Sequence, residues 1–163
     1  MIYICLILSV ALIIIGAELI RKYSKRYKRS ISFKTSLDLT GLPVITFYQG
    51  KNKFNFLFDT GATNSVIDNR MLPNIKHTLI EDATCEVYGI EGNVQTVNFV
   101  TIQFERELDY SDDFQVVDMS SAFDQVKAET GVTISGILGN TFFQKYKYVL
   151  DYNKMVCYSK LWM

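Results

Sequence analysis

The sequence predicts an all-β domain with one or two short helices, preceded by one N-terminal transmembrane helix. From residue 33 onward, short apolar segments alternate with turns rich in glycine, asparagine and aspartate. Residues 120–131 are the best candidate for a soluble helix, with serine at the start and glycine at the end. Many short strands with so little helix favour a closed or folded β-barrel.

The composition limits the classes of protein and partner. The 163 residues suffice for one ordinary globular domain. Residues 1–35 carry seven basic and one acidic side chain (net +6), whereas residues 36–163 carry ten and sixteen (net −6). An acidic main domain argues against nucleic acid as a partner, because phosphate binding requires a basic face. The apolar content of 48 % excludes a disordered chain.

No cofactor or metal ion is expected. The three cysteines, Cys5, Cys85 and Cys157, are far apart and form no CxxC motif, and His77 is the single histidine. This argues against both a disulfide scaffold and a conventional zinc site. We expect these four side chains to be structural.

Residues 1–20 are predicted to form a membrane anchor. Residues 1–17 contain no charged side chain and are followed by Glu18, Leu19 and Ile20. About 20 mostly apolar residues are needed to cross the hydrocarbon core of a bilayer. The alternative is a cleaved signal peptide, but such a segment starts with a basic region, which is missing here.

Residues 21–32 are predicted to form a basic juxtamembrane linker. Six of the nine residues in RKYSKRYKR, at positions 21–29, are Lys or Arg. Lys and Arg close to a spanning helix stay on the cytoplasmic side of the membrane. We therefore expect a single-pass membrane protein whose domain, residues 33–163, lies in the cytoplasm. An ordinary solvated linker would be compatible with the same composition.

The elements of the domain follow from alternation and from turn residues. Strands are expected at residues 33–39, 43–48, 53–58, 65–68, 85–105 with a turn at Gly89–Gly92, 114–117 and 134–138. The residues Gln-Gly-Lys-Asn at 49–52 are typical of a hairpin turn. A short helical turn at residues 140–144 and a hairpin around Asn153 complete the domain.

The residues best suited to chemistry are Asp59, Thr60 and Gly61, between two apolar segments. A carboxylate at the end of a hydrophobic strand is costly unless something solvates it. Glycine lets backbone amides approach such a carboxylate closely. The alternative is an Asx-type turn that closes a hairpin, which these residue types also favour. A buried strand interrupted by a charged loop is an unusual way to make a turn, so the flanking residues favour a site.

This segment resembles the catalytic loop of the aspartic proteases, specifically the single-lobe, retropepsin-like group. In that family two apolar residues precede Asp-Thr-Gly-Ala, as Leu57 and Phe58 do here. The family's second signature is two apolar residues and a glycine before a short helix, and Ile137, Leu138 and Gly139 match it. With the predicted anchor, the chain resembles a membrane-anchored bacterial-type member.

The resemblance implies an aspartic endopeptidase with the acid-protease β-barrel fold. In that family two aspartates share one proton and activate one water, because like charges about 3 Å apart cannot both be ionised. The resemblance assigns Asp59 the catalytic role, Thr60 a hydroxyl bond to the partner loop, and Gly61 backbone donation to the carboxylate. The sequence contains one Asp-Thr-Gly. The second aspartate is therefore expected from another copy, in a homodimer.

The resemblance also implies a cleft that binds a peptide or protein substrate beneath a β-hairpin flap. Tyr88, Gly89, Ile90 and Gly92 are expected to form the flap, although an ordinary glycine-containing hairpin is equally compatible with these residues. The floor of the cleft is expected to include Ala62, Ile137, Leu138 and Gly139.

Two other functions are open on the sequence alone. A catalytically inactive module could keep the fold and bind an extended peptide by strand addition. A purely structural β-barrel would explain the strands but not the charged loop beside a buried strand. For an active enzyme in the cytoplasm, we expect a peptidase optimum at mildly acidic or neutral pH.

Overall fold

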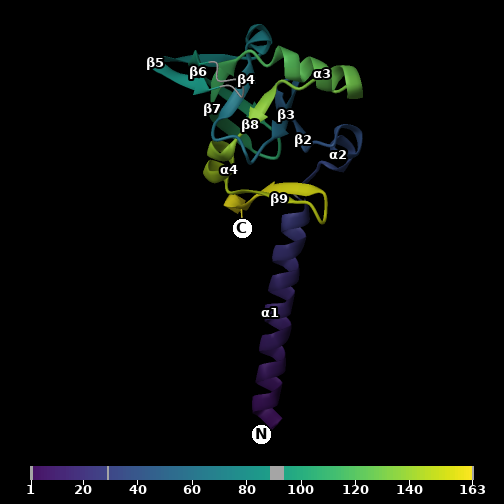
Figure 1. The fold of residues 1–163 in the computed structure, drawn as a ribbon. Helices are drawn as coiled ribbons and strands as arrows, with labels where there is room; N and C mark the ends of the chain where they lie inside the picture. Colours follow the sequence, from purple (N-terminus) through teal and green to yellow (C-terminus); the bar gives the residue numbers. More distant parts are fainter. Residues whose placement is uncertain (1, 29, 89–93, 163) are drawn as a thin grey trace.

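The computed structural model describes residues 2–28, 30–88 and 94–162, and the side chains of residues 8–21, 30–81, 83, 84 and 96–161. A β-rich domain lies at the end of a long N-terminal helix (Figure 1). In chain order the elements are α1 (Ile2–Lys28), β1 (Ile31–Ser32), α2 (Lys34–Thr40), β2 (Val44–Gln49), β3 (Asn52–Phe58), β4 (Ser65–Asp68), the 3-10 helix η1 (Asn69–Asn74), β5 (His77–Tyr88), β6 (Val94–Glu105), β7 (Asp109–Val117), α3 (Ser120–Thr130), β8 (Gly136–Leu138), α4 (Asn140–Tyr146), β9 (Tyr148–Asp151), β10 (Val156–Ser159) and the 3-10 helix η2 (Lys160–Trp162).

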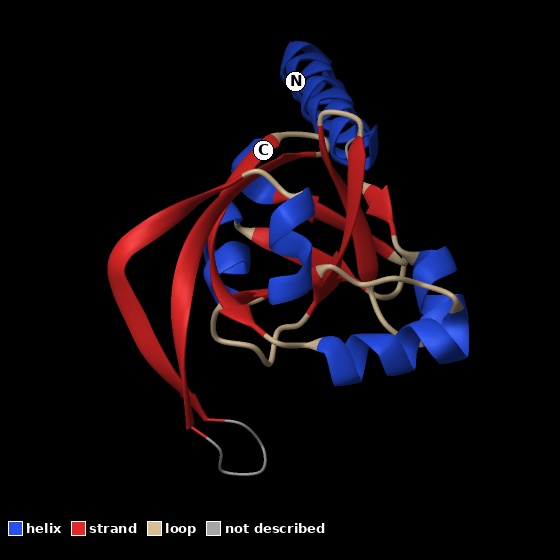
Figure 2. Ribbon diagram, turned by 90° about the horizontal axis from the view of Figure 1, so that it is seen from above, coloured by secondary structure: helices blue, strands red, loops and turns tan. Residues whose placement is uncertain are grey.

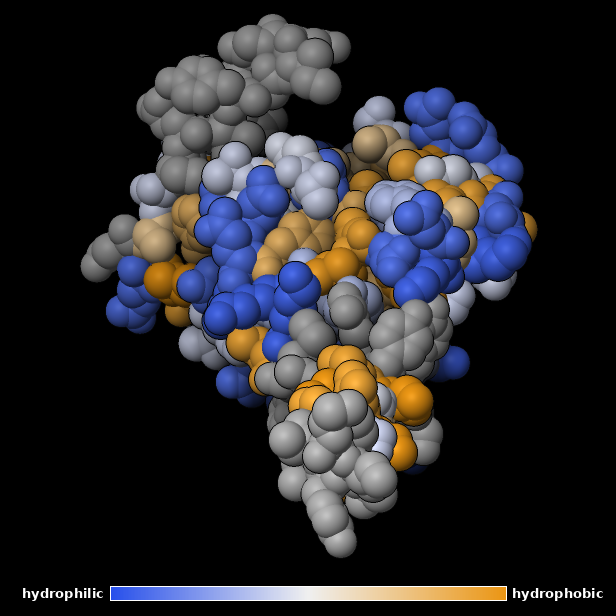
Figure 3. Space-filling view, turned by 90° about the horizontal axis from the view of Figure 1, so that it is seen from below, coloured by the Kyte–Doolittle hydropathy of each residue, from blue (hydrophilic) through white to orange (hydrophobic). Residues whose placement is uncertain are grey.

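Helix α1 projects from the domain (Figure 1), and the large apolar side chains of its described part are exposed (Figure 3). They are Leu8, Val10, Leu12, Ile13, Ile14, Ile15, Leu19 and Ile20. Among the described residues, no helix combines the length and the apolar character that crossing a membrane requires. The helix is thus as expected, but the predicted membrane span of residues 1–20 is not confirmed. The side chains of residues 1–7, which belong to that prediction, lie outside the described residues.

Most strands belong to one seven-stranded sheet in the order β2-β3-β8-β4-β7-β6-β5. A single further pairing, Tyr48 with Glu105, joins β2 to β6. It joins two strands that are not neighbours in that order, but this one residue pair does not confirm the predicted closed barrel. The mostly β content with a few short helices agrees with the predicted fold class.

Strand β3 shows why the alternating pattern was informative. Phe54, Phe56 and Phe58 point to one side and are buried, whereas Asn55 and Leu57 between them are half-buried. The turn to β2 contains Gly50 at φ +62°, a conformation that favours glycine. The predicted hairpin at residues 43–58 is therefore confirmed.

The core of the domain consists largely of aromatic rings. Phe47 lies edge-on to Phe104 at 4.9 Å between centroids and to Tyr110 at 5.6 Å. Phe142 from α4 packs against Phe58 and Tyr110 of the sheet. Such ring pairs contribute beyond the area that they bury, so α4 is held firmly against the sheet.

The prediction of a strand at residues 33–39 is wrong, because residues 34–40 form helix α2. The sequence FKTSLDL alternates, but Gly41 follows with φ +70°, and its N–H donates to the carbonyl of Leu37 at 2.8 Å. This is a left-handed C-cap, which ends a helix. Over seven residues, the helical and strand periods cannot be separated by alternation alone.

Helix α3 is confirmed, and Gly131 ends it at φ +75°. Its predicted N-cap is wrong, since Ser120 lies inside the helix and Met119 occupies the cap position. The side chain of Asp118 instead accepts from the Ser120 N–H at 2.9 Å. The side chain that satisfies this N-terminal donor thus lies two residues earlier than the serine that the sequence suggested.

A second sheet contains three strands in the order β1-β10-β9, so β9 forms one edge of it. Cys157 on β10 is fully buried and reduced, and burial raises the pKa of its thiol to about 12. The thiol is therefore protonated near neutral pH and packs as part of the core. The expectation of a structural role agrees with this position.

Candidate active site

The loop with Asp59 lies where three strands meet. It connects β3 to β4, and β8 is inserted between these two strands. Strand β8 runs parallel to β3, with Phe58 opposite Leu138, and antiparallel to β4, with Val66 opposite Ile137. The two sequence signatures, far apart in the chain, are thus neighbours in the sheet.

Within the loop, the backbone is arranged around the Asp59 side chain. The N–H of Gly61 donates to Asp59 Oδ1 at 2.8 Å, and the N–H of Asp59 donates to the Leu138 carbonyl at 3.1 Å. Asp59 is half-buried, while Thr60 and Gly61 are exposed. The carboxylate is therefore oriented by the backbone and still reachable from solvent.

The first residues of α4 donate hydrogen bonds to the loop. The N–H groups of Asn140 and Thr141 donate to the carbonyls of Ala62 at 2.8 Å and Thr63 at 3.2 Å. The side-chain amide of Asn140 donates to the Thr60 carbonyl at 2.9 Å. The first N–H groups of a helix have no acceptor within the helix, so the carbonyl oxygens of the loop accept these hydrogen bonds.

Gly139 permits this close approach. A Cβ atom at position 139 would lie 2.4 Å from the carbonyl oxygen of Asn64 and 3.0 Å from that of Ala62. A side chain at position 139 would therefore push β8 and α4 away from the loop. The lack of space for a side chain therefore explains why the second signature has a glycine at this position.

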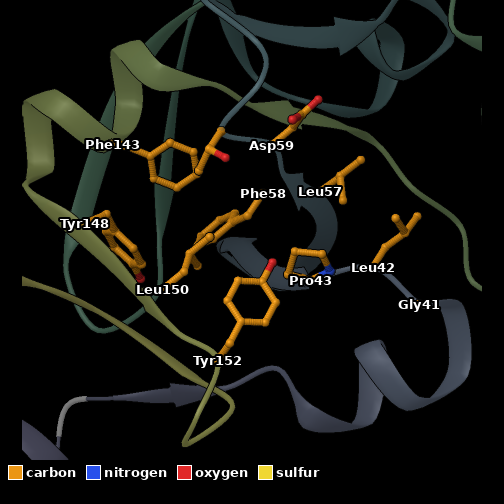
Figure 4. Close-up of a pocket in the computed structure, with 11 residues that line it drawn as sticks. Gly41, Leu42, Pro43, Leu57, Phe58, Asp59, Phe143, Tyr148, Leu150 and Tyr152 are labelled. Atoms are coloured by element: carbon orange, nitrogen blue, oxygen red, sulfur yellow. The ribbon is translucent and has the colours of Figure 1, made fainter.

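A pocket of about 660 Å³ adjoins Asp59. Figure 4 shows Asp59 at one end of it and Tyr152 at the other, with Phe58 and Pro43 between them. Its lining is mostly apolar and is formed by Gly41, Leu42, Pro43, Leu57, Phe58, Asp59, Thr60, Phe143, Tyr148, Leu150 and Tyr152. The pocket offers an apolar surface beside a single oriented carboxylate.

The structure gathers most of the predicted site residues. Asp59, Thr60, Gly61 and Ala62 lie directly against the segment that contains Ile137, Leu138 and Gly139.

Within the described ranges, no three His, Cys, Asp or Glu side chains lie close enough together to hold a metal ion.

The predicted flap falls at the end of a long ribbon formed by β5 and β6, which runs out from the body of the domain (Figure 2). The pairing of the two arms is described as far as Tyr88 opposite Val94. Gly89, Ile90 and Gly92, and the side chain of Tyr88, lie outside the described residues. The two paired arms are thus observed, and the role of residues 88–92 as a flap stays a prediction.

Sequence reasoning missed one pair of buried polar residues behind the loop. Ser65, at the start of β4, donates its hydroxyl proton to Asp112 Oδ2 at 2.6 Å, and both residues are buried. The signal was in β7, where Asp112 occupies the buried phase of the alternation between Tyr110 and Phe114. A carboxylate in the inward phase of a strand calls for a specific partner.

Comparison with known proteins agrees with this geometry. The family model of retroviral aspartyl proteases matches residues 40–151, which is more than half of the chain and includes the Asp59 loop, β8 and α4. The chain belongs to the retroviral aspartyl protease family. No curated protein matches the sequence. The resemblance to the retropepsin-like aspartic proteases is thereby confirmed, whereas the match does not show a membrane-anchored bacterial-type member. Membership of this retropepsin family points to an aspartic peptidase.

Proposed function

We propose that the protein is an aspartic endopeptidase that hydrolyses peptide bonds as a homodimer, with one Asp59 from each subunit. The main support is the Asp59 loop itself, whose carboxylate is oriented by the Gly61 N–H and remains accessible beside an apolar pocket. The bond from the Gly61 N–H to Asp59 is also the bond of an Asx-type turn, so the support lies in its combination with the pocket and with the packing of the loop against β8 and α4.

The reaction needs two carboxylates and one water. One carboxylate takes a proton from the water as it attacks the scissile carbonyl carbon, and the other donates a proton to the carbonyl oxygen, which gives a tetrahedral diol. The C–N bond then breaks as the first group gives its proton to the leaving nitrogen and the second takes a proton back from a diol hydroxyl. The Gly61 N–H, already bonded to Asp59 Oδ1, fixes the orientation of the carboxylate before substrate binds. Thr60 is exposed beside it, where its hydroxyl can reach the same loop of a second subunit.

The pocket beside Asp59 is suited to an apolar side chain of the substrate. Leu42, Pro43 and Leu57 form one part of its wall. An extended peptide that crosses the site would place alternate side chains on one face, as a strand does. We therefore expect cleavage next to apolar or aromatic residues.

The edge strand β9 supports the homodimer. Leu150 of β9 and Tyr152, just after it, line the same pocket as Asp59, so the free edge and the site open on one face. Antiparallel pairing of β9 with its own copy has two-fold symmetry, as does the pairing of two Asp59 loops. One axis can therefore relate both, and the two three-stranded sheets would then join edge to edge.

The first test of the proposal is Asp59→Asn. The amide keeps the size of the side chain and can still accept from the Gly61 N–H, so the fold should survive. Peptidase activity on a denatured protein mixture should fall by at least about a thousandfold, because the dyad loses its acid-base chemistry. Asp113→Asn, an exposed carboxylate on β7, is the matched control and should cleave like the parent.

The alternative is a catalytically inactive peptide-binding module with the same fold. It predicts that the parent protein binds peptides but cleaves none, under conditions where the dimer is present. Parent activity that survives Asp59→Asn would contradict both the dyad mechanism and the assignment of Asp59.

We also propose that residues 1–20 hold the domain at a membrane, with the basic residues of positions 21–29 on the cytoplasmic side. The support is the uncharged run of residues 1–17 and the exposed apolar side chains of α1, which would otherwise contact water. Digestion of the domain by a protease added outside intact cells would contradict this sidedness. Release of the full chain from membranes by a salt wash would contradict the anchor.

A further inference from the structure

Behind the Asp59 loop, a chain of hydrogen bonds joins three elements of the domain. Asp112 on β7 accepts from the Ser65 hydroxyl at 2.6 Å, and the Ser65 oxygen in turn accepts from the Gly139 N–H at 3.2 Å. Ser65 ends the Asp59 loop, and Gly139 joins β8 to α4. The chain therefore links the two segments that make the site.

The direction of these bonds follows from the donors available. A serine hydroxyl has one proton, and a carboxylate oxygen can only accept. When the proton points to Asp112, the lone pairs of the Ser65 oxygen face the Gly139 N–H. An O–H···O separation of 2.6 Å is typical of a bond to an ionised carboxylate, which is stronger than a neutral one.

Burying the Asp112 carboxylate costs free energy, because the charged group loses its contact with water. Asp112 is 4 % exposed and Ser65 is 0 % exposed. Desolvation by burial has the largest effect on the Asp112 carboxyl group and raises its pKa. The Ser65 hydroxyl, Lys145 on α4 and the backbone of Asp113 favour the ionised form and offset this in part, whereas the Asp113 carboxylate repels the charge. An apolar residue at this position would avoid the cost of burying the carboxyl group.

We propose that Asp112 is a positioning residue for the Asp59 loop: by orienting the Ser65 hydroxyl, it holds the Gly139 amide and so fixes Asp59 relative to β8. This inference rests on the proposed peptidase function. Asp112 takes no part in the chemistry, since it acts through Ser65 and Gly139. Loss of the Ser65 acceptor should loosen the loop and lower kcat more than it changes KM.

The test compares Asp112→Ala, Asp112→Asn, Ser65→Ala and the double variant Asp112→Ala/Ser65→Ala in the full chain. We expect Asp112→Ala and Ser65→Ala each to lower kcat by about tenfold, with KM within about twofold of the parent. The double variant should be no worse than either single one, because both changes break the same chain. Asp112→Asn can still accept from Ser65 and should recover part of the loss.

The matched control is Asp113→Asn. Asp113 is the neighbouring carboxylate, and it accepts from the Thr101 hydroxyl at 2.7 Å, away from the loop. Its variant should have the kcat of the parent. Equal losses in Asp113→Asn and Asp112→Ala would indicate a general charge effect and overturn the proposal, as would an Asp112→Asn variant no better than Asp112→Ala.

A second readout does not depend on activity. Hydrogen exchange of the Gly139 amide should be about tenfold faster in Asp112→Ala and Ser65→Ala, and unchanged in Asp113→Asn. Unchanged exchange in both alanine variants would overturn the positioning role. If the parent itself cleaves nothing, the proposed function fails, while the exchange result still decides whether Asp112 positions the loop. Should Asp112→Ala not fold, Ser65→Ala and Asp112→Asn carry the same comparison.

Discussion

The Asp59 loop and the β5–β6 ribbon are both parts of the predicted cleft, yet they are built in different ways. The loop depends on partners that are 74 and 80 positions away in sequence, through Gly139 to Ser65 and Asn140 to Thr60. In the ribbon, β5 forms the outer edge of the sheet and pairs with β6, the next strand in the chain, whereas β6 also pairs with β7 from Phe99 to Glu105. Contacts between distant segments thus hold the loop, whereas β5 depends on its neighbour in the chain.

The exposed fractions of the side chains also differ between the Asp59 loop and the ribbon. Behind the loop, Ser65 and Leu138 are fully buried, whereas Leu79 on β5 is 58 % exposed. The pairing of β5 with β6 also shifts between Ile80 and Thr84, which is a bulge or irregularity. We expect substitutions behind the loop to affect stability and catalysis strongly, and substitutions at the exposed positions of β5 to have small effects on stability, whereas Val100, Ile102 and Phe104 of β6 belong to the core.

The largest effect on stability is expected for Gly139→Ala. The added Cβ would lie 2.4 Å from the Asn64 carbonyl oxygen, so β8 or the loop must move, which should lower the free energy of unfolding by about 3 kcal/mol. Gly131→Ala is the control, because that position is open but has φ +75°, and should cost about 1 kcal/mol. Urea denaturation followed by circular dichroism measures both. Equal losses would mean that the close approach at Gly139 has no special weight.

The next effect concerns the edge of the second sheet. Val149→Lys places a charge on β9, where two copies of the strand would bring like charges together, so the dimer should dissociate at least about tenfold more readily. Sedimentation at several protein concentrations measures this, and peptidase activity should fall in parallel. Ser121→Lys adds the same charge to the exposed side of α3 and should leave the dimer intact. An unchanged dimer in Val149→Lys would place the interface elsewhere.

A smaller effect is expected from pH. Burial raises the pKa of Asp112 above its ordinary value of 3.8, so the folded protein binds this proton more readily than the unfolded chain does. The contribution of Asp112 to the free energy of unfolding therefore falls as pH rises from 3.8 through the raised pKa, and then stays constant. Asp112→Asn removes this contribution. The stability of the variant relative to the parent should consequently increase with pH over that range. Denaturation curves that show a constant difference would contradict the shift.

The smallest effect is expected for Leu79→Thr on the ribbon. The side chain is exposed, and threonine suits a strand, so the free energy of unfolding should change by less than about 0.5 kcal/mol. Thermal denaturation of the variant beside Gly139→Ala measures the contrast between the two regions directly. A loss above that limit would show that Leu79 packs against something in solution, and the division between loop and ribbon would need revision.

Features that depend on neighbouring residues could be predicted from the sequence. The buried face of β3, the hairpin at Gly50 and the helix that ends at Gly131 each depend on a local pattern or a single backbone conformation. The Asp59 loop and Gly139 could be identified because each belongs to a short sequence motif, Asp-Thr-Gly for the loop and two apolar residues followed by glycine for Gly139. The prediction of a strand at residues 33–39 was wrong because it depended on a local pattern alone. Seven residues hold too few periods to separate a helix from a strand.

Only the tertiary structure decided what lies between and behind these elements. The sequence predicted a strand at residues 134–138, where β8 lies, but the insertion of β8 between β3 and β4 depends on the sheet as a whole. The bond from Ser65 to Asp112 spans 47 positions, and neither residue marks the other in the sequence. Hydrogen bonds between distant segments form because folding brings their donors and acceptors together in a place without water, where leaving them unpaired would be costly.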